Sequence, residues 1–283
     1  MNKHLVKGLK ILCSIVCALT VFGISDLHSK EPEKTNKDDG ELFKIAIAGY
    51  TFVNFNIDQT LKMMEEVDVH YLCIKDFHLP INSTEAEIAA FHAKLASHNV
   101  TGYAVGPIYM KTEQEVDRAF EYARKVGVKL IVGVPNHEVL PYVEKKVKEY
   151  NFKYAIHLHG PDIELYPDAD DIYSHIKNLD TRIGMCLDIG HDARAGKDPI
   201  ADLKKYKDRI FDIHMKNTTG ANKAGKTGEI GRGIINIPAF VRMLREVKYS
   251  GACSLEYERN MQKPLAGIAE SIGYFRGVID ATK

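Results

Sequence analysis

The chain has 283 residues, of which 45% are hydrophobic, and its 38 basic and 38 acidic side chains give a net charge of zero. This length and composition suit one globular domain with a large core, or two small ones. Because the charges balance, composition offers no basic surface for nucleic acid or anionic lipid, and we expect neither kind of partner.

The N-terminus differs from the rest of the chain. Residues 1–25 begin with a basic stretch, MNKHLVKGLK, and continue with an apolar run that ends near Ser25. This pattern is typical of a signal peptide, and the run is short for a transmembrane helix. We therefore predict a signal peptide over residues 1–25, a polar linker over 26–42, a folded domain over 43–283, and export to the periplasm without a stable membrane span. A signal anchor and a lipoprotein are the alternatives, although Ser-Ile-Val before Cys17 makes a weak lipobox.

Three cysteines lie beyond the predicted signal peptide, at Cys73, Cys186 and Cys253. Each stands inside an apolar, strand-like run, where a thiol packs as a small hydrophobic side chain. We therefore expect three buried, unpaired thiols and no disulfide framework.

Beyond residue 42, short β-rich runs alternate with stretches of helical periodicity. The predicted strands cover residues 44–52, 71–77, 101–110, 129–135, 153–159, 182–191, 210–217 and 252–258. The clearest predicted helices cover residues 57–67, 85–98, 113–126 and 237–247. Cap signals support these bounds: Asn56 or Asp58 at the first helix, a Thr112–Glu115 capping box at the third, and Gly127 after it.

The alternation predicts a parallel sheet covered by helices, because strands rich in Val, Ile and Leu are buried on both faces. Eight consecutive β/α pairs in about 240 residues match a single-domain α/β fold, the (β/α)8 TIM barrel. A doubly wound open sheet is the alternative. It usually carries a Gly-rich phosphate loop after its first strand, and AGYTFVNFN (48–56) is not such a loop.

Polar residues of the types that bind metals or protons recur at the predicted strand ends. In TIM barrels the catalytic groups stand at the C-terminal ends of the strands. Those ends carry Lys75 and His78, Pro135 and Asn136, His157 and His159, Asp188 and His191, His214 and Lys216, and Glu256 and Glu258. Strand ends that were only exposed to solvent would favour Ser, Thr, Asn and Lys. Asp, Glu and His instead dominate the ends of the last four predicted strands.

Several of these residues are lone ionisable groups on apolar strands. Asp188, His214 and Glu256 are costly to bury unless they are paired or bind a cation. His157 and His159 would point to the same face of one strand, as metal ligands, acid/base groups or plain polar residues. A set of two imidazoles and two carboxylates suits Mn²⁺, Zn²⁺, Fe²⁺ or Co²⁺ better than Mg²⁺ or Ca²⁺.

Five blocks of the sequence resemble one superfamily, the xylose-isomerase-like TIM barrels, which include sugar and sugar-phosphate isomerases and epimerases. The blocks are CLDIGH (186–191), FDIHMK (211–216), GRGIINIPAF (231–240), YSGACSLEYE (249–258) and AESIGYFRG (269–277). The IHxHGP and CxDxGH patterns are similar to an exported subgroup, some relatives of which cleave 3-keto-glycosides by β-elimination. Endonuclease IV shares the fold, but it needs a trinuclear zinc cluster and a DNA-binding surface.

The resemblance implies one divalent metal ion, held by His157, Asp188, His214 and Glu256. The family usually has glutamate at the first of these positions. In keto-sugar 3-epimerases that glutamate and the one on the eighth strand are the two acid/base groups, so His157 departs from the two-glutamate pattern.

The resemblance places His159 and His191 at positions that contact substrate in relatives, and we expect roles for further residues at the strand ends and on the Gly-rich loop that carries Arg232. Glu256 is the expected general base, and a second acid/base group would come from His159, His191 or Lys75. Expected substrate-binding residues are His191, Lys216, Arg232 and His78, although Lys216 could instead pair with Asp212. His92, His98, His137 and His175 are expected at the surface.

The implied function is a metal-dependent sugar isomerase or epimerase that removes a proton next to the carbonyl of a keto-sugar. A 3-keto-glycoside lyase using the same site is one alternative, and a non-catalytic, exported sugar-binding barrel is an alternative of another class. The expected partner is a small-molecule sugar, and an oligomer is compatible with the sequence.

Overall fold

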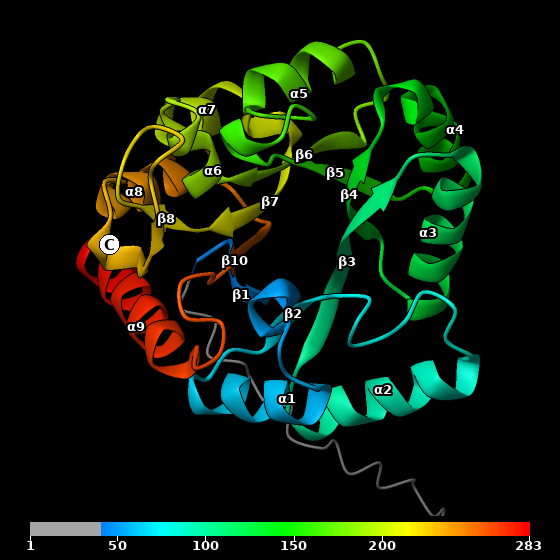
Figure 1. Cartoon of the computed structure of the whole chain (residues 1–283), viewed down its shortest axis with the longest axis horizontal. Coiled ribbons are helices and arrows are strands. Elements are labelled where there is room, and N and C mark those ends of the chain that lie inside the picture. Colours follow the sequence, from blue (N-terminus) through cyan, green and yellow to red (C-terminus); the bar gives the residue numbers. More distant parts are fainter. Residues whose placement is uncertain (1–40) are drawn as a thin grey trace, which may run out of the picture. The chain divides into compact units, whose positions relative to one another are not determined.

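Eight parallel strands close into a barrel in the computed structural model, which describes residues 41–283 (Figure 1). The order around the barrel is β1-β10-β7-β6-β5-β4-β3-β2, and β1 pairs with both β10 and β2. The predicted TIM barrel is confirmed, and closure of the sheet excludes the doubly wound alternative. The predicted signal peptide and the linker up to residue 40 lie outside the described residues.

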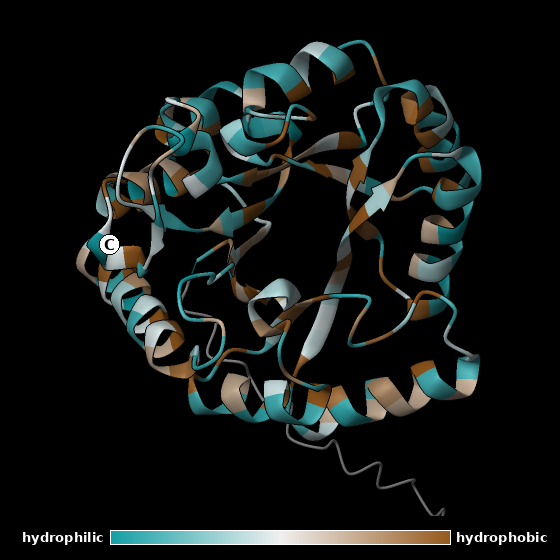
Figure 2. Cartoon of the chain, viewed as in Figure 1, coloured by the Kyte–Doolittle hydropathy of each residue, from teal (hydrophilic) through white to brown (hydrophobic). Residues whose placement is uncertain are grey.

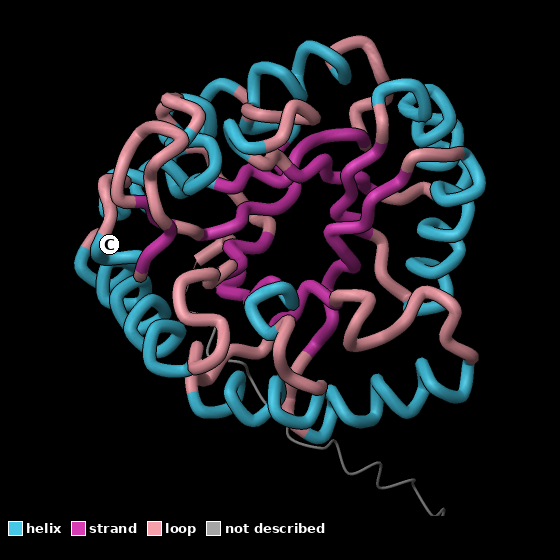
Figure 3. Tube along the Cα trace, in the orientation of Figure 1, coloured by secondary structure: helices cyan, strands magenta, loops and turns pink. Residues whose placement is uncertain are grey.

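Helices surround the strands, as the tube view makes plain (Figure 3). The barrel strands are β1 (Lys44–Ala48), β2 (Tyr71–Ile74), β3 (Thr101–Met110), β4 (Leu130–Pro135), β5 (Lys153–His157), β6 (Ile183–Asp188), β7 (Ile210–Met215) and β10 (Ala252–Leu255). The helices are α1 (Ile57–Glu66), α2 (Glu85–Ser97), α3 (Glu113–Val126), α4 (Leu140–Tyr150), α5 (Ala169–Ile176), α6 (Ile189–Arg194), α7 (Pro199–Lys205), α8 (Ile237–Glu246) and α9 (Leu265–Ala281).

Short elements fill the connections. Five 3₁₀ turns within residues 41–283 cover Gly49–Phe52, His137–Val139, Gly160–Asp162, Lys207–Arg209 and Ile230–Arg232. An antiparallel pair, β8 (Asn217–Thr218) with β9 (Thr227–Gly228), extends the β7–α8 connection and was not predicted from the sequence.

The predicted helix caps are confirmed. Asn56 and Gln59 form a reciprocal capping box at α1, and Thr112 and Glu115 form another at α3. Each box satisfies two backbone N–H groups that the first helical turn leaves without partners. Gly127 ends α3 in the left-handed conformation.

The main core lies between the strand ring and the helix layer. Figure 2 shows the apolar residues of the helices turned inward and the polar ones outward. Phe120 of α3, for example, stacks on Tyr154 of β5 with ring centroids 6.0 Å apart. Cys73 and Cys186 belong to a second cluster of small apolar residues, and they and Cys253 are buried and free, as predicted.

A polar layer crosses the barrel below its C-terminal end. The Tyr103 hydroxyl of β3 donates to Asp212 Oδ2 of β7 at 2.9 Å and contacts Ser254 Oγ of β10. Burial raises the pKa of Asp212 to about 7, although His214 and the Tyr103 hydrogen bond oppose the rise. This layer ties three strands together directly beneath His214.

Several predicted strands end earlier than expected. β6 stops at Asp188, and residues 189–191, predicted as strand, begin α6. The cause is local: the Asp188 carboxylate accepts the backbone N–H of His191 at 2.8 Å and so caps α6. β5 likewise ends at His157, which places His159 in the following turn.

None of the helices in residues 41–283 combines the length and apolar character that a membrane-spanning segment needs.

Replacing Tyr103 with Phe removes the hydroxyl that bridges Asp212 and Ser254. We expect the free energy of unfolding to fall by about 1–3 kcal/mol, because buried polar atoms lose their partner. Urea denaturation followed by circular dichroism measures this change. The matched control is Tyr274→Phe on the exposed side of α9, which should stay within about 0.5 kcal/mol of wild type. Equal stability of the two variants would contradict the structural importance of this layer.

Candidate active site

Four buried side chains converge at the C-terminal ends of neighbouring strands. His157 ends β5, Asp188 ends β6, His214 belongs to β7, and Glu256 follows β10. These strands are consecutive neighbours in the barrel, and Asp188 and His214 are partners in the register of β6 and β7. All four residues are buried, and one ligand-type atom from each lies within 4.8 Å of the others.

The spacing of these atoms suits a single cation. His214 Nδ1 lies 3.0 Å from His157 Nε2 and 3.2 Å from Glu256 Oε2. His157 Nε2 is 3.9 Å from both Asp188 Oδ2 and Glu256 Oε2. Tetrahedral metal–ligand bonds of about 2.0–2.2 Å separate neighbouring ligand atoms by about 3.3–3.6 Å, so small side-chain rotations suffice.

The chemistry of the set also fits a divalent ion. Asp188 Oδ2 is buried, and among residues 41–283 it has the Lys216 ammonium at 3.0 Å as an ion-pair partner but no hydrogen bond of good geometry. With neutral imidazoles, the carboxylates of Asp188, Glu256 and Glu258 and the ammonium of Lys216 leave two negative charges (three minus one). Two imidazole nitrogens with carboxylate oxygens are the donors that Zn²⁺, Mn²⁺, Fe²⁺ and Co²⁺ accept.

Lys216 is the fixed positive charge of the site and is only 1% exposed. Its ammonium lies 3.0 Å from Asp188 Oδ2, 2.8 Å from Glu256 Oε2 and 2.6 Å from Glu258 Oε2. Its side chain passes Gly190 so closely that a Cβ there would stand 2.7 Å from Lys216 Cγ. Lys216 therefore orients the carboxylates and does not pair with Asp212, which takes Tyr103 instead.

The buried groups set one another's protonation. Burial acts to raise the pKa of Glu256, but Lys216 and His214 outweigh it and hold that pKa well below its usual value. Burial raises the pKa of Asp188 to about 6 against the attraction of Lys216. Burial and His214 hold the pKa of His157 well below its usual value. At neutral pH, Glu256 is therefore a charged base and His157 a neutral imidazole. Against the effect of burial, Glu256 raises the pKa of His214 to about 9, so His214 is an imidazolium that hydrogen-bonds to His157 Nε2.

A pocket of about 400 Å³ opens above this set, within the usual size range for small-ligand sites. Its lining residues are Tyr50, Lys75, Pro107, Tyr109, His157, His159, Asp162, Ile163, His191, Glu256 and Glu258. Tyr50, Tyr109 and Ile163 are exposed at its rim, although large apolar side chains are usually covered. The pocket thus combines an acidic floor with an apolar rim.

Besides Glu256, three of the predicted catalytic or substrate-binding residues line the pocket, namely Lys75, His159 and His191. Lys75 Nζ donates to Asp76 Oδ1 at 2.6 Å and to the Pro107 carbonyl at 2.9 Å. His191 Nε2 lies 3.1 Å from Lys216 Nζ. His159 has a partner that could not be predicted from the sequence.

His159 pairs with Tyr109 across the pocket, with the Tyr109 hydroxyl 2.8 Å from His159 Nε2. Burial lowers the pKa of His159 to about 4, so its imidazole is neutral at pH 7. Gly160 follows with a φ of +71°, and a Cβ there would lie 3.0 Å from the His191 carbonyl oxygen. That crowding explains glycine in the HGP block.

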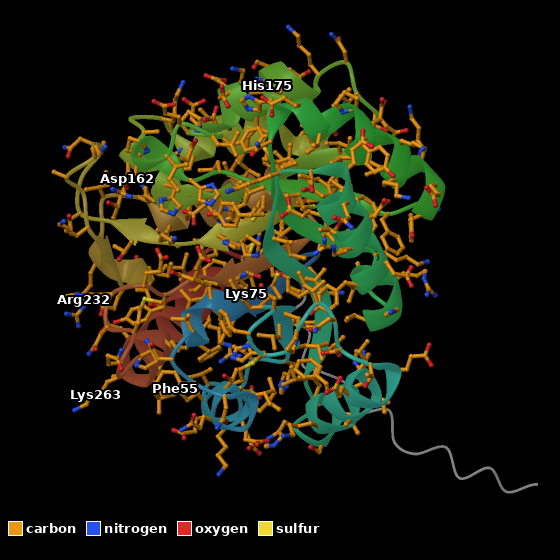
Figure 4. All side chains as sticks on the ribbon, turned by 45° about the vertical axis from the view of Figure 1, so that its right-hand side comes forward. Phe55, Lys75, Asp162, His175, Arg232 and Lys263 are labelled. Atoms are coloured by element: carbon orange, nitrogen blue, oxygen red, sulfur yellow. The ribbon has the colours of Figure 1, made fainter. Side chains whose placement is uncertain are left out.

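Two predicted substrate-binding residues are not brought to the pocket. His78 is buried beneath α1, where Nε2 lies 3.2 Å from Thr60 Oγ1 and 3.1 Å from the Phe55 carbonyl oxygen. Arg232 is exposed and forms an ion pair with Glu270 of α9. Figure 4 shows Arg232 at the edge of the barrel, away from Lys75.

Sequence reasoning missed Tyr109, Asp162 and Ile163 as pocket residues. Tyr109 lies near the end of β3, a ten-residue strand that contains no Asp, Glu, His or Lys. Asp162 and Ile163 lie in the turn after His159, and their inward position depends on the left-handed Gly160. The only signal available was their closeness in sequence to strand ends.

Comparisons with known proteins agree with this fold. A family model described as xylose isomerase-like TIM barrel matches residues 44–278. An inosose dehydratase of Clostridium tetani is 25% identical over 270 residues, covering 88% of this chain and 82% of the dehydratase. The structure of an uncharacterised protein of Parabacteroides distasonis matches with a TM-score of 0.66 and 25% identity, covering 83% of this chain and 99% of that one. The crystal structure of IolI protein with a bound zinc atom has the same fold, with a TM-score of 0.68 and 19% identity, covering 85% of this chain and 99% of IolI.

Replacing His214 with Ala removes one imidazole from the floor of the pocket. We expect the variant to lose one equivalent of bound Zn²⁺ or Mn²⁺ per chain, because a ligand is missing and its neighbours are buried. Equilibrium dialysis followed by elemental analysis gives the count. His98→Ala, at the surface end of α2, is the matched control and should bind as wild type does. A His214→Ala variant that holds as much metal as wild type would rule out this centre.

Proposed function

The chain belongs to the xylose isomerase-like TIM barrel family, and from that premise we propose that it is a divalent-metal-dependent lyase acting on a keto-sugar or keto-polyol. The reaction would remove a proton from the carbon next to the carbonyl and expel a substituent from the following carbon. One observation carries the proposal: His157, Asp188, His214 and Glu256 form a buried ligand set beneath a pocket with acid/base walls.

A metal ion would be held by those four residues, and when bound it would act as a Lewis acid on substrate oxygens. Zinc in the IolI structure and the dehydratase activity named for the Clostridium tetani relative support this choice. Dehydration next to a carbonyl is itself a β-elimination.

Glu256 is the proposed general base. Its Oε2 faces His214 Nδ1 at 3.2 Å and Lys216 Nζ at 2.8 Å, which leaves Oε1 to receive a proton. Lys216 keeps this carboxylate ionised and fixes its orientation, so no reorganisation is needed when the substrate carbon loses its proton.

The Tyr109–His159 pair is the proposed acid. Burial raises the pKa of Tyr109 and lowers that of His159, so both are neutral at pH 7. The phenol can donate its proton to the departing oxygen when His159 Nε2–H donates to the phenol oxygen, and that hydrogen bond then stabilises the phenolate until it is reprotonated from solvent. The protons and bonds of the elimination are then accounted for. Glu256 takes the carbon-bound proton, the C–O bond breaks, and the leaving oxygen receives a proton from this pair.

The position of His157 favours elimination over epimerisation. Epimerisation needs acid/base groups on both faces of the carbon, and the family's usual glutamate is replaced here by a buried neutral imidazole. Its Nε2 lies 3.0 Å from His214 Nδ1 and 3.9 Å from Glu256 Oε2, within the proposed ligand set. Isomerisation or epimerisation is the second candidate, because Glu258 supplies another carboxylate at the pocket wall.

The pocket suits an unphosphorylated substrate. The lining residues of this pocket in the described barrel include three acidic side chains, Asp162, Glu256 and Glu258, but only one lysine, Lys75. A phosphate group would therefore meet excess negative charge there. Tyr50 and Tyr109 at the rim offer aromatic faces to a sugar ring or aglycone. Export to the periplasm, which we also propose from the N-terminal sequence, would agree, because sugar phosphates are mostly cytoplasmic.

Incubating the metal-loaded protein with an inosose, a 3-keto-glucoside and a ketohexose tests the reaction class. We expect release of water or aglycone and a new ultraviolet absorbance from the conjugated product, and Glu256→Gln should lower kcat about 10²–10⁴-fold. Glu246→Gln on the surface of α8 is the matched control, and metal content is measured for each variant. Epimer formation without elimination would favour the second candidate, and full activity of Glu256→Gln would exclude it as the base.

Replacing Tyr109 with Phe separates the two halves of the reaction. We expect leaving-group release to slow at least about 10²-fold, because the acid is lost. Exchange of the substrate α-proton with solvent deuterium, followed by NMR, should continue because Glu256 is untouched. Tyr274→Phe serves as control. If exchange and release fall together, Tyr109 does not act as the acid of the second step.

A further inference from the structure

A second group of metal-binding side chains lies outside the pocket, where the β4–α4 turn meets α5. His137 begins the 3₁₀ turn after β4, and Asp171 and His175 lie one turn apart on α5. One ligand-type atom from each lies within 4.8 Å of the other two. Residues four apart on a helix share a face, which explains how Asp171 and His175 both reach His137.

The two imidazoles are stacked, with centroids 3.9 Å apart and planes inclined by 18°. Both histidines are half-buried, although the sequence led us to expect them at the surface. Figure 4 shows His175 on α5, apart from Lys75, which marks the pocket.

The atoms of this group are not satisfied by the protein. His137 Nε2 and Asp171 Oδ2 are buried, and neither has a hydrogen-bond partner among residues 41–283. Buried polar atoms are nearly always paired, so two in one cluster indicate an external partner. His175 Nδ1 lies 2.9 Å from the Asp171 carbonyl oxygen, which can only accept. Nδ1 therefore carries the proton, and the lone pair of His175 Nε2 is free.

We propose that His137, Asp171 and His175 bind a second divalent transition-metal ion, of which Zn²⁺ is the prototype. Two imidazoles and one carboxylate form a donor set for such an ion, with the remaining positions open to water. Burial and the neighbouring His175 lower the pKa of His137, which keeps that imidazole neutral as a ligand must be. The partial exposure of all three residues gives the ion a path from solvent.

The second site would stabilise the turn that carries His159 at one wall of the pocket. Tyr166 packs edge-on against His137, with centroids 5.0 Å apart, and against His175 at 6.2 Å. Tyr166 has a φ of +60°, unusual for a non-glycine residue, and its carbonyl accepts the backbone N–H of His159 at 2.9 Å. An ion bound behind Tyr166 thus holds the turn that presents His159 to the pocket. The inference does not depend on the proposed reaction.

Zinc stoichiometry tests the second site. Untagged protein is stripped with a chelator, equilibrated with Zn²⁺, passed through gel filtration and analysed for metal per chain. We expect two equivalents of Zn²⁺ per chain in wild type, one in His175→Ala and one in Asp171→Asn. Asp171→Asn keeps the test decisive if His175→Ala folds poorly. The matched control His98→Ala, a histidine beside Glu65 at the end of α2, should keep two.

The outcomes of the two metal proposals can be told apart. His214→Ala should also hold one equivalent, and the double variant His175→Ala, His214→Ala none. Loss of an equivalent in His175→Ala but not in His214→Ala would support the second site and overturn the central one. Wild-type zinc content in both His175→Ala and Asp171→Asn overturns the second site.

Discussion

The structure depends on a concentration of buried charge at the end of the barrel, held by the ammonium of Lys216. Asp188, Glu256 and Glu258 all lie within 3.0 Å of that nitrogen. Carboxylates so close together repel one another and lose their hydration, so each would be costly without a compensating cation. Lys216 cancels one charge of three, and, although burial opposes the rise, Glu256 raises the pKa of His214 to about 9. A divalent ion that displaces the His214 proton would be held by both imidazoles and by the carboxylates of Asp188 and Glu256.

The surrounding fold brings the residues of this charge cluster together and leaves room for the Lys216 side chain. Parallel strands bring their C-terminal ends to one rim, so neighbours far apart in sequence meet there. Asp188 serves twice, as a member of the cluster and as the cap of α6, which turns the chain so that His191 faces Lys216. Gly190 leaves the space that the Lys216 stem occupies.

The strand and helix alternation, the closed barrel and the convergence at strand ends could be predicted because they follow from periodicity and topology. Positions of individual side chains after the strands could not. His78 turns under α1 and Arg232 pairs with Glu270, choices set by local hydrogen-bond partners. His137 and His175 were predicted to be at the surface because nothing in the sequence shows that two different β/α units stack their imidazoles. The stacking of His137 on His175 follows from how the β4–α4 turn and α5 pack side by side around the barrel.

The central claim is that His157, Asp188, His214 and Glu256 surround one divalent ion. Crystals grown with Zn²⁺, with data collected on both sides of the zinc absorption edge, test it most directly. The account predicts an anomalous difference peak among the four side chains, within about 2.0–2.3 Å of their ligand atoms. Density without such a peak, with the four side chains well ordered around Lys216 alone, would contradict it.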